Sequence, residues 1–262
     1  MSDERITADR PAIPEGGGTR RMKAILVVVA AVTFIASPLF TSGFGGFDPD
    51  LFPIPQVRPP VQPAGYAFSI WGLIYVWLLA HAGYGLLMRA GDGGWDAGRW
   101  WLIVSLGVGA SWIAVANTSA PWASILIWVM LIGALGALWR APRGPETRDR
   151  WLGQAPVAVY AGWLTAASWV AIGFMLGGYG VLAPVWAAAV CLVLAAAMAV
   201  AVQRRLPQAP EYGLTVIWAL VAVVVANLTT SWQIASLAIV AVAVMAWTLA
   251  RAAAVARMQA RG

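Results

Sequence analysis

The chain has 262 residues, of which 61% are apolar and 11% are charged, and its formal net charge is +6. This composition leaves too little polar surface to cover a water-soluble globule of this size, so it excludes an ordinary soluble domain. A nucleic-acid-binding protein would gather Lys and Arg on one folded face, whereas here they lie between apolar runs. We therefore expect the partners of the chain to be membrane lipids and not nucleic acid.

Residues 1–22 are polar and rich in Gly, Pro and charges of both signs, which predicts a disordered tail. Eight apolar runs follow, each close to the roughly 20 residues that cross a hydrocarbon core of about 30 Å. They cover residues 23–42, 67–88, 100–118, 121–140, 155–175, 181–202, 212–230 and 233–250. We predict an all-α, polytopic transmembrane bundle of eight spans, in which polar turns at 117–121 and 227–233 each separate two adjoining spans.

The basic residues test the number of spans, because Lys and Arg near span ends are retained on the cytoplasmic side. Eight spans place every basic residue except Arg58 on one side of the membrane. We therefore expect a multi-pass protein of a bacterial-type inner membrane with both termini in the cytoplasm, residues 252–262 forming the C-terminal tail. The alternative for the first run is a cleaved signal peptide, since Arg20, Arg21 and Lys23 precede it.

The predicted membrane interior carries no carboxylate, because every Asp and Glu lies in the tail, in a loop or, for Glu211, at a span edge. Proton- or sodium-coupled transport usually needs one. Paired carboxylates, a Ser/His/Asp set, a metal-ligand cluster and a phosphate-binding Gly loop are also missing from the sequence. The sequence therefore predicts that the protein is not an enzyme.

The single histidine, His81, lies in the second run among small residues. A neutral imidazole can ligate the metal of haem or chlorophyll, so one interpretation is an axial ligand. The other is a hydrogen bond to a neighbouring helix or a position in the membrane interface.

Sixteen tryptophans are the most unusual feature of the composition. Interfacial belts explain those near predicted span ends. Six fall deeper, where lipid tails cannot accept from the indole N–H, so they should face protein or a ligand: Trp77, Trp112, Trp128, Trp163, Trp169 and Trp218. Phe68, Trp71 and Tyr75 follow helical spacing, which predicts an aromatic face that is either helix packing or the wall of a pocket for a flat apolar molecule.

One long segment lies outside the predicted spans, the Pro- and Gly-rich loop 43–66. It carries too many apolar side chains for a free tether, namely Phe44, Phe47, Leu51, Phe52 and Ile54. We predict that this loop packs back over the outer mouth of the bundle, either as a lid or by simple docking.

Residues 58–75, RPPVQPAGYAFSIWGLIY, resemble the tryptophan-rich sensory protein family, also called the TspO/MBR or translocator-protein family. In that family a Pro-rich loop leads into a helix start with the pattern Pro-x-Gly-x-x-Phe-x-x-x-Trp-x-x-x-Tyr. Pro63, Gly65 and Phe68 reproduce the pattern, and Trp71 stands one place earlier, with Tyr75 at the family spacing of four residues after it. Residues 155–167 are similar to the Pro-led, aromatic fifth helix of the family.

The resemblance covers residues 23–175 and implies a five-helix bundle, beyond which residues 176–251 form an additional three-span region. It also implies binding of porphyrins, haem or other flat hydrophobic molecules, for sensing or transport, in a Trp-lined pocket beneath the first loop. The residues that the resemblance places in this ligand-binding site are Phe68, Trp71, Tyr75, Trp112, Tyr160 and Trp163. Gly109 and Trp169 stand where the family usually has Asn, so the polar contacts of those Asn residues are not expected here.

Two alternatives to a tetrapyrrole-binding sensor or transporter stay open at this point. The chain can be a structural accessory subunit that packs through Ala-rich faces at 187–189 and 195–197 against a larger, pigment-bearing membrane complex, or against a second copy of itself. It can also be an uncoupled membrane transporter.

Overall fold

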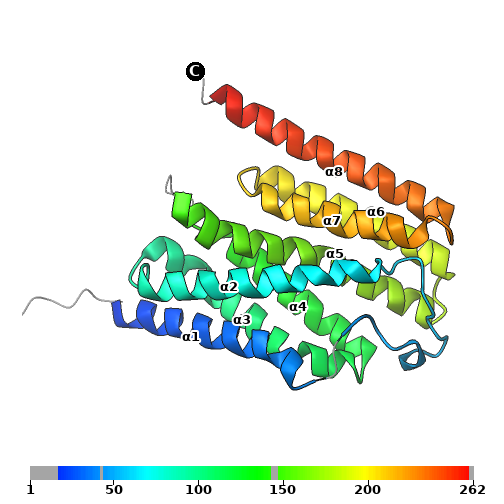
Figure 1. Cartoon of the computed structure of the whole chain (residues 1–262), viewed down its shortest axis with the longest axis horizontal. Helices are drawn as coiled ribbons and strands as arrows, with labels where there is room; N and C mark the ends of the chain where they lie inside the picture. The colour runs from blue at the N-terminus through cyan, green and yellow to red at the C-terminus, as the bar shows by residue number, and fades with distance from the viewer. Residues whose placement is uncertain (1–16, 42–43, 143–146, 260–262) are drawn as a thin grey trace, which may run out of the picture.

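The structure, a computed structural model, describes residues 17–41, 44–142 and 147–259, and these residues form long helices with no strand among them (Figure 1). The long helices are α1 (Gly17–Ala36), α2 (Ile70–Leu87), α3 (Gly93–Ala116), α4 (Ala120–Trp139), α5 (Ala155–Gly178), α6 (Pro184–Arg205), α7 (Pro210–Asn227) and α8 (Trp232–Gln259). All eight are long and apolar enough to cross a membrane. The prediction of an all-α bundle of eight spans is confirmed.

The helix ends follow the turn and cap chemistry of the sequence. Asp92 caps α3 by accepting hydrogen bonds from the backbone N–H groups of Gly94 and Trp95 at 2.7 and 3.1 Å. A proline stands in the first turn of each of α4, α5, α6 and α7, where its missing N–H has no intrahelical partner to lose. The polar turns 117–119 and 228–231 separate α3 from α4 and α7 from α8, as the sequence predicts.

The first and last helices reach beyond the predicted spans. Because α1 begins at Gly17, the prediction that residues 17–22 belong to a disordered tail is wrong; Arg20 donates to the Gly91 carbonyl at 3.1 Å and helps to hold this turn on the bundle. Helix α8 continues to Gln259, so residues 252–259 are helical instead of a tail. Their run of alanines explains this, since Ala has the highest helix propensity. Residues 1–16 and 260–262 lie outside the described residues.

The helices form two rings that share α5. The first ring runs α1, α2, α5, α4, α3, and the second runs α5, α6, α8, α7. Helix α5 is the most buried of the spans, with 72% of its most apolar stretch inside the protein. The rings meet closely at Gly162, where a Cβ would lie 2.5 Å from the Tyr212 carbonyl oxygen of α7. Small residues at such crossings let two membrane helices approach through their backbones.

The start of α1 and the end of α8 lie at the same end of the bundle, as an even number of spans requires (Figure 1). Ion pairs gather there and hold the helix ends together: Lys23 with Asp96 at 2.6 Å, Arg89 with Asp149 at 3.1 Å, and Arg150 with Glu211 at 2.6 Å. That this end faces the cytoplasm stays a prediction from the arginine distribution. We call it the charged end.

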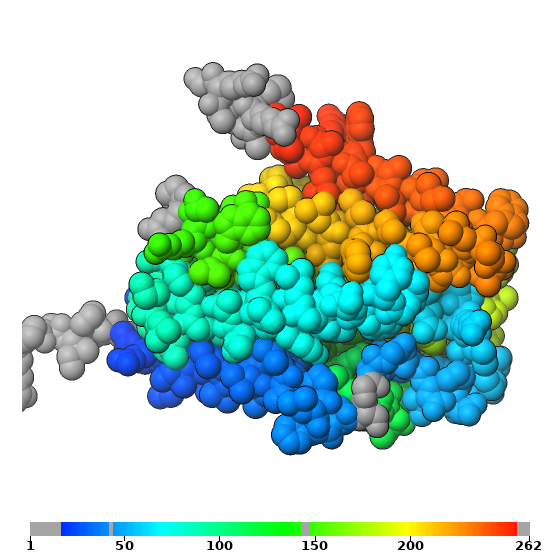
Figure 2. Space-filling view, in the orientation of Figure 1, coloured from blue at the N-terminus to red at the C-terminus, as the bar shows by residue number. Residues whose placement is uncertain are grey.

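The loop that leads into α2 lies at the opposite end of the bundle, where Figure 2 shows it packed beside the start of α2 and near the α7–α8 turn. The loop contains two short helical turns, η2 (Pro49–Leu51) and η3 (Gly65–Ser69). The backbone N–H of Ile54 donates to the Gly178 carbonyl at the end of α5, 2.9 Å away. The prediction that this loop packs back over one mouth of the bundle is confirmed for residues 44–66.

Candidate functional site

Aromatic side chains from α1, α2 and α5 meet inside the first ring. Phe34 packs edge-on against Trp71 and Tyr75, with ring centroids 5.8 and 5.3 Å apart. Trp71 stacks on Tyr75 at 5.4 Å and packs edge-on against Trp163 at 6.1 Å. Because Trp71 and Tyr75 are four residues apart, one helix face presents both. The predicted aromatic face of the second span therefore belongs to the interior of the ring.

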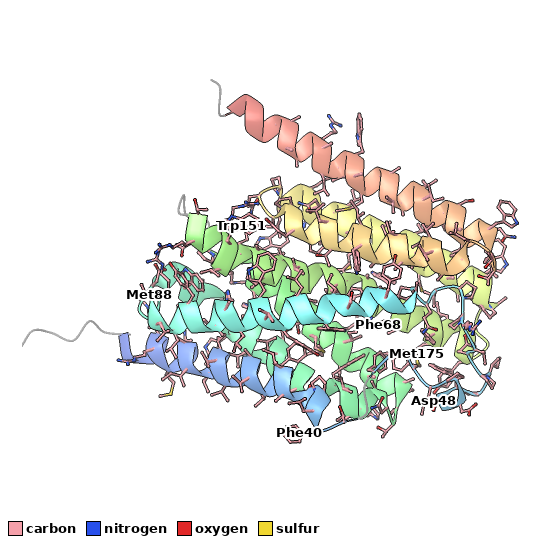
Figure 3. The ribbon with its side chains drawn as sticks, viewed as in Figure 1. Phe40, Asp48, Phe68, Met88, Trp151 and Met175 are labelled. Atoms are coloured by element: carbon pink, nitrogen blue, oxygen red, sulfur yellow. The ribbon has the colours of Figure 1, made fainter. Side chains whose placement is uncertain are left out.

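Phe68 extends this cluster toward the loop. It lies 5.8 Å from Trp163 and 6.3 Å from Phe44, between ring centroids. Figure 3 shows Phe68 in the half of the bundle nearer the loop, away from Met88 and Trp151 at the charged end. The site therefore lies in the half of the bundle that the loop covers.

Two cavities lie among these rings. The first, here called the aromatic cavity, has a volume of about 170 Å³ and is lined by Phe34, Pro38, Phe44, Trp71, Tyr75, Trp112, Ile113 and Met130. The second, here called the long cavity, has a volume of only about 80 Å³ but reaches from the loop to α6, α7 and α8. Phe44, Trp71 and Trp112 line both. These three side chains therefore form the wall between the two cavities.

Two side chains at the aromatic cavity, Trp112 in its wall and Tyr160 behind it, have their polar groups hydrogen-bonded within the protein. The indole N–H of Trp112 donates to the Ala123 carbonyl at 2.9 Å. The hydroxyl of Tyr160 lies 3.0 Å from the Ser105 hydroxyl, which in turn donates to the Met130 carbonyl at 2.6 Å. The described residues of the lining include no charged side chain, and aromatic rings make up much of it, so it offers a bound molecule mainly contact with ring faces and edges.

The surroundings of Gly109 leave no room for the Asn that the family usually has at this position. A Cβ at this position would lie 2.7 Å from the ring of Phe34, so the ring occupies the space that a side chain on Gly109 would need. An Asn at this position cannot coexist with Phe34 in its present place. Gly109 and Phe34 therefore fit each other: the ring of Phe34 occupies the space that is left by the missing side chain of Gly109.

The loop closes the mouth of the site through its own aromatic residues. Phe44 packs edge-on against Trp112 at 4.7 Å, and Phe47 against Phe174 of α5 at 5.4 Å. Phe52 stacks on Phe174 at 5.8 Å. Phe47 and Phe52 are buried at 8% and 4% exposure, so this part of the loop is a fixed cover and not a free tether.

The second ring anchors the other end of the loop. The Asn227 side-chain amide donates to the Pro60 carbonyl at 2.9 Å, and the backbone N–H of Ala64 donates to the Ala222 carbonyl at 3.0 Å. The indole N–H of Trp218 donates to the Ala67 carbonyl at 3.1 Å. Three hydrogen bonds between the loop segment and one helix, α7, therefore position the residues that lead into Phe68 and Trp71.

The six residues that the resemblance implies as a site fall into two groups. Phe68, Trp71, Trp112 and Trp163 line the long cavity, and Trp71, Tyr75 and Trp112 line the aromatic cavity. Tyr160 lines neither; it is fully buried behind Phe34, 5.8 Å away between ring centroids. The structure thus brings five of the six to a cavity wall and places the sixth behind it.

Sequence reasoning missed Phe34, and it missed the contribution of α6 and α7 to the long cavity. Phe34 follows Val27, Ala30 and Ala31 on one buried face of α1, so helical periodicity within the first span carries a signal for it. The lining residues of α6 and α7 are mostly alanine and aliphatic, which no pattern in the sequence distinguishes from ordinary packing.

His81 lines neither cavity. Its Nδ1 lies 2.8 Å from the carbonyl oxygen of Leu152 in η4 (Asp149–Gln154), the π-helical turn before α5, and its ring stacks on Trp95 at 5.0 Å. Of the two sequence interpretations, the geometry matches the hydrogen bond to a neighbouring helix. Trp77 makes a similar hydrogen bond to the same turn: its indole N–H donates to the Trp151 carbonyl at 2.8 Å.

Of the six deep tryptophans, Trp163 packs edge-on against Phe68 and Trp71, and the other five divide into paired and unpaired indoles. Those of Trp77, Trp112 and Trp218 each donate to a backbone carbonyl, as expected for indoles that face protein. Trp128 and Trp169 pack edge-on against each other at 5.2 Å, and both buried N–H groups lack an acceptor within the described part of the chain. Trp169 also lines the long cavity, so the wall of this cavity contains a buried hydrogen-bond donor without a partner.

The fold and the site together define a multi-pass α-helical membrane protein with an aromatic internal cavity covered by a loop. Residues 54–251 match the model of a family described as TSPO-like protein, which is more than half of the chain. The chain belongs to this TSPO-like, or TspO/MBR, family. The match includes α6, α7 and most of α8, so it extends past the five spans of the sequence resemblance. No curated protein and no solved structure matches the chain.

Proposed function

We propose that this protein binds porphyrins or similarly flat, hydrophobic tetrapyrroles without covalent chemistry, for sensing or transport in the membrane. The observation that carries the proposal is the pair of adjoining aromatic-lined cavities, which share Phe44, Trp71 and Trp112 in their walls. The faces and edges of these three aromatic rings offer the offset and edge-on contacts that flat conjugated molecules prefer.

Size indicates how such a molecule is accommodated. Cavities that enclose small-molecule ligands usually hold about 300–1,000 Å³. The aromatic cavity, at about 170 Å³, is below this range, and the long cavity is narrower still. We infer that binding moves the dividing wall, most simply by a rotamer change of Trp71 or Phe44, so that the two cavities merge around the ligand.

The placement of carboxylates supports capture of a ligand over ion-coupled transport. Asp96, Asp149 and Glu211 are held in ion pairs with Lys23, Arg89 and Arg150 at the charged end, away from the aromatic cavity. Coupling to protons or sodium usually relies on a carboxylate within the transport path.

The test is a titration of the purified protein with protoporphyrin, followed by tryptophan fluorescence and by porphyrin absorbance. We expect saturable quenching, and we expect Trp71→Ala combined with Tyr75→Ala to raise Kd at least about tenfold, since about 1.4 kcal/mol corresponds to that factor and two aromatic contacts supply it.

The matched control is Trp122→Ala combined with Tyr179→Ala, which removes the same two fluorophores from positions that are 63% and 47% exposed. We expect this control to keep the Kd of the unmodified protein. Equal Kd values in both double variants, with both still folded by thermal unfolding, would remove the site from this region.

A further inference from the structure

The long cavity does not stop at the first ring. Beyond Trp163 its wall continues on α5 with Ala166 and Ala167, and it then runs along α6 and α7. The lining there comes from Ala188, Cys191, Leu192 and Ala195 of α6 and from Ala219 and Val223 of α7. We call this part the aliphatic arm. All six of these side chains are buried.

The aliphatic arm is narrow and has no charged side chain in its lining. Protein interiors are close-packed, and voids that exceed a water molecule are few. A continuous space between helices that is apolar also holds water poorly, because water needs two or more polar partners. The small size of the alanines, on both α6 and α7, keeps the arm open but too thin for a macrocycle.

Among the described residues that line the long cavity, Trp169 has a fully buried polar group without a partner, its indole N–H. This N–H is buried, and a buried donor without an acceptor is costly. An ester or carbonyl oxygen of a bound molecule would satisfy it. This buried donor is thus suited to the junction between a polar group and a hydrocarbon chain.

We propose that the aliphatic arm binds a single long aliphatic chain whose ester or carbonyl oxygen accepts the hydrogen bond from Trp169. The chain has two possible sources: an alcohol esterified to a tetrapyrrole whose ring lies in the first ring, or an acyl chain of a membrane lipid. The first source rests on the proposed function; the second does not. The two arms of the experiment below separate the sources.

The first arm compares protoporphyrin with its ester of a long-chain alcohol on three proteins. Ala195→Phe fills the aliphatic arm, and Ala197→Phe makes the same change at an exposed position of the same helix. We expect Ala195→Phe to raise the Kd of the ester about tenfold relative to that of the free acid, because burial of two methylene groups is worth at least this factor. Ala197→Phe should change neither.

The second arm uses Cys191, the only cysteine of the chain, as a reporter inside the aliphatic arm. Its rate of reaction with methyl methanethiosulfonate is measured with the methyl ester of a long-chain fatty acid and with that of a short-chain acid. We expect the long-chain ester to slow the reaction several-fold. Trp169→Phe should weaken the protection, and Ala195→Phe should abolish it. If Ala195→Phe does not fold, Ala219→Leu takes its place with the same expected result.

Ester-selective porphyrin binding together with protection of Cys191 assigns the chain to the tetrapyrrole, and protection alone assigns it to a lipid. If the protein shows no preference for the ester and no protection of Cys191, the inference is overturned. If no porphyrin binds at all, the proposed function fails, and the protection of Cys191 still decides whether the arm holds a chain.

Discussion

The two rings that share α5 are built from different side chains. The first ring surrounds its cavity with Phe34, Trp71 and Tyr75, which contact one another at edge-on or stacked distances, and with Trp112, which packs edge-on against Phe44. The second ring has alanines and aliphatic residues around its share of the long cavity, and it holds the loop through Asn227 and Trp218. One ring is suited to contact a flat ligand, and the other is suited to position the cover over it.

This difference shows that the additional helices are more than an appendage to a five-helix bundle. The entry into α2, with Phe68 and Trp71, is fixed by hydrogen bonds to α7. A five-helix fragment would lack these anchors and one wall of the long cavity. The comparison can be tested at the shared helix, at the first ring and at the loop anchors, in decreasing order of expected effect.

The largest effect is expected where the rings join. Gly162→Ala places a Cβ 2.5 Å from the Tyr212 carbonyl oxygen, and a backbone atom cannot move aside as a flexible side chain can. Overpacking of this kind costs about 1–3 kcal/mol, which exceeds the gain of about 1 kcal/mol from replacing Gly by Ala in a helix. We expect a lower free energy of unfolding, measured in detergent.

Gly107→Ala is the control for this change, because Gly107 is in a helix and a Cβ there meets nothing within 4 Å. It should be neutral or slightly stabilising. If Gly162→Ala is as stable as Gly107→Ala, the two rings do not depend on the close crossing of α5 and α7.

A smaller effect is expected inside the first ring. Gly109→Asn forces the Phe34 ring to move, since a Cβ would lie 2.7 Å from it. The ring is a side chain and can shift, so we expect a loss of about 1–2 kcal/mol in stability, at the low end for overpacking. Adding Phe34→Ala should recover part of this loss. Additive losses in the double variant would contradict the complementarity of these two positions.

The smallest effect is expected at the loop anchor. Asn227→Leu removes the hydrogen bond to the Pro60 carbonyl, worth about 1 kcal/mol, without touching either cavity. We expect porphyrin to dissociate about threefold to fivefold faster in stopped-flow measurements, since about 1 kcal/mol corresponds to this factor. Thr118→Val, at an exposed turn outside the loop contacts, should leave the rate unchanged. Unchanged dissociation in both variants would mean that the loop does not gate the site.

Much of the fold could be predicted because the membrane imposes few solutions. Apolar runs of span length gave eight helices, and the Asn and Thr turns at 117–119 and 228–231 separated helices that hydropathy alone nearly merges. The helix ends were less predictable. Gly17 and Gln259 lie in polar or Ala-rich segments where tertiary contacts and helix propensity extend a helix past its apolar run.

Helical spacing predicted only the site residues that share one helix, whereas Trp112, Tyr160 and Trp163 were expected from the resemblance to the family. Phe68, Trp71 and Tyr75 repeat at helical spacing, so a pattern shows them. The pairing of Gly109 with Phe34 joins two helices far apart in sequence, and no local pattern encodes it. The aliphatic arm is harder still, because Ala188, Ala195 and Ala219 are ordinary residues for a membrane helix, and their cavity exists only through the packing of α5, α6 and α7.

The most direct test of the central claim is an experimental structure of the protein with protoporphyrin bound. The account predicts ligand density between Trp71, Tyr75 and Trp112, with the Trp71 or Phe44 side chain displaced so that the two cavities are joined. Density on the lipid-facing surface alone, or a closed wall between the cavities in a saturated complex, would contradict it.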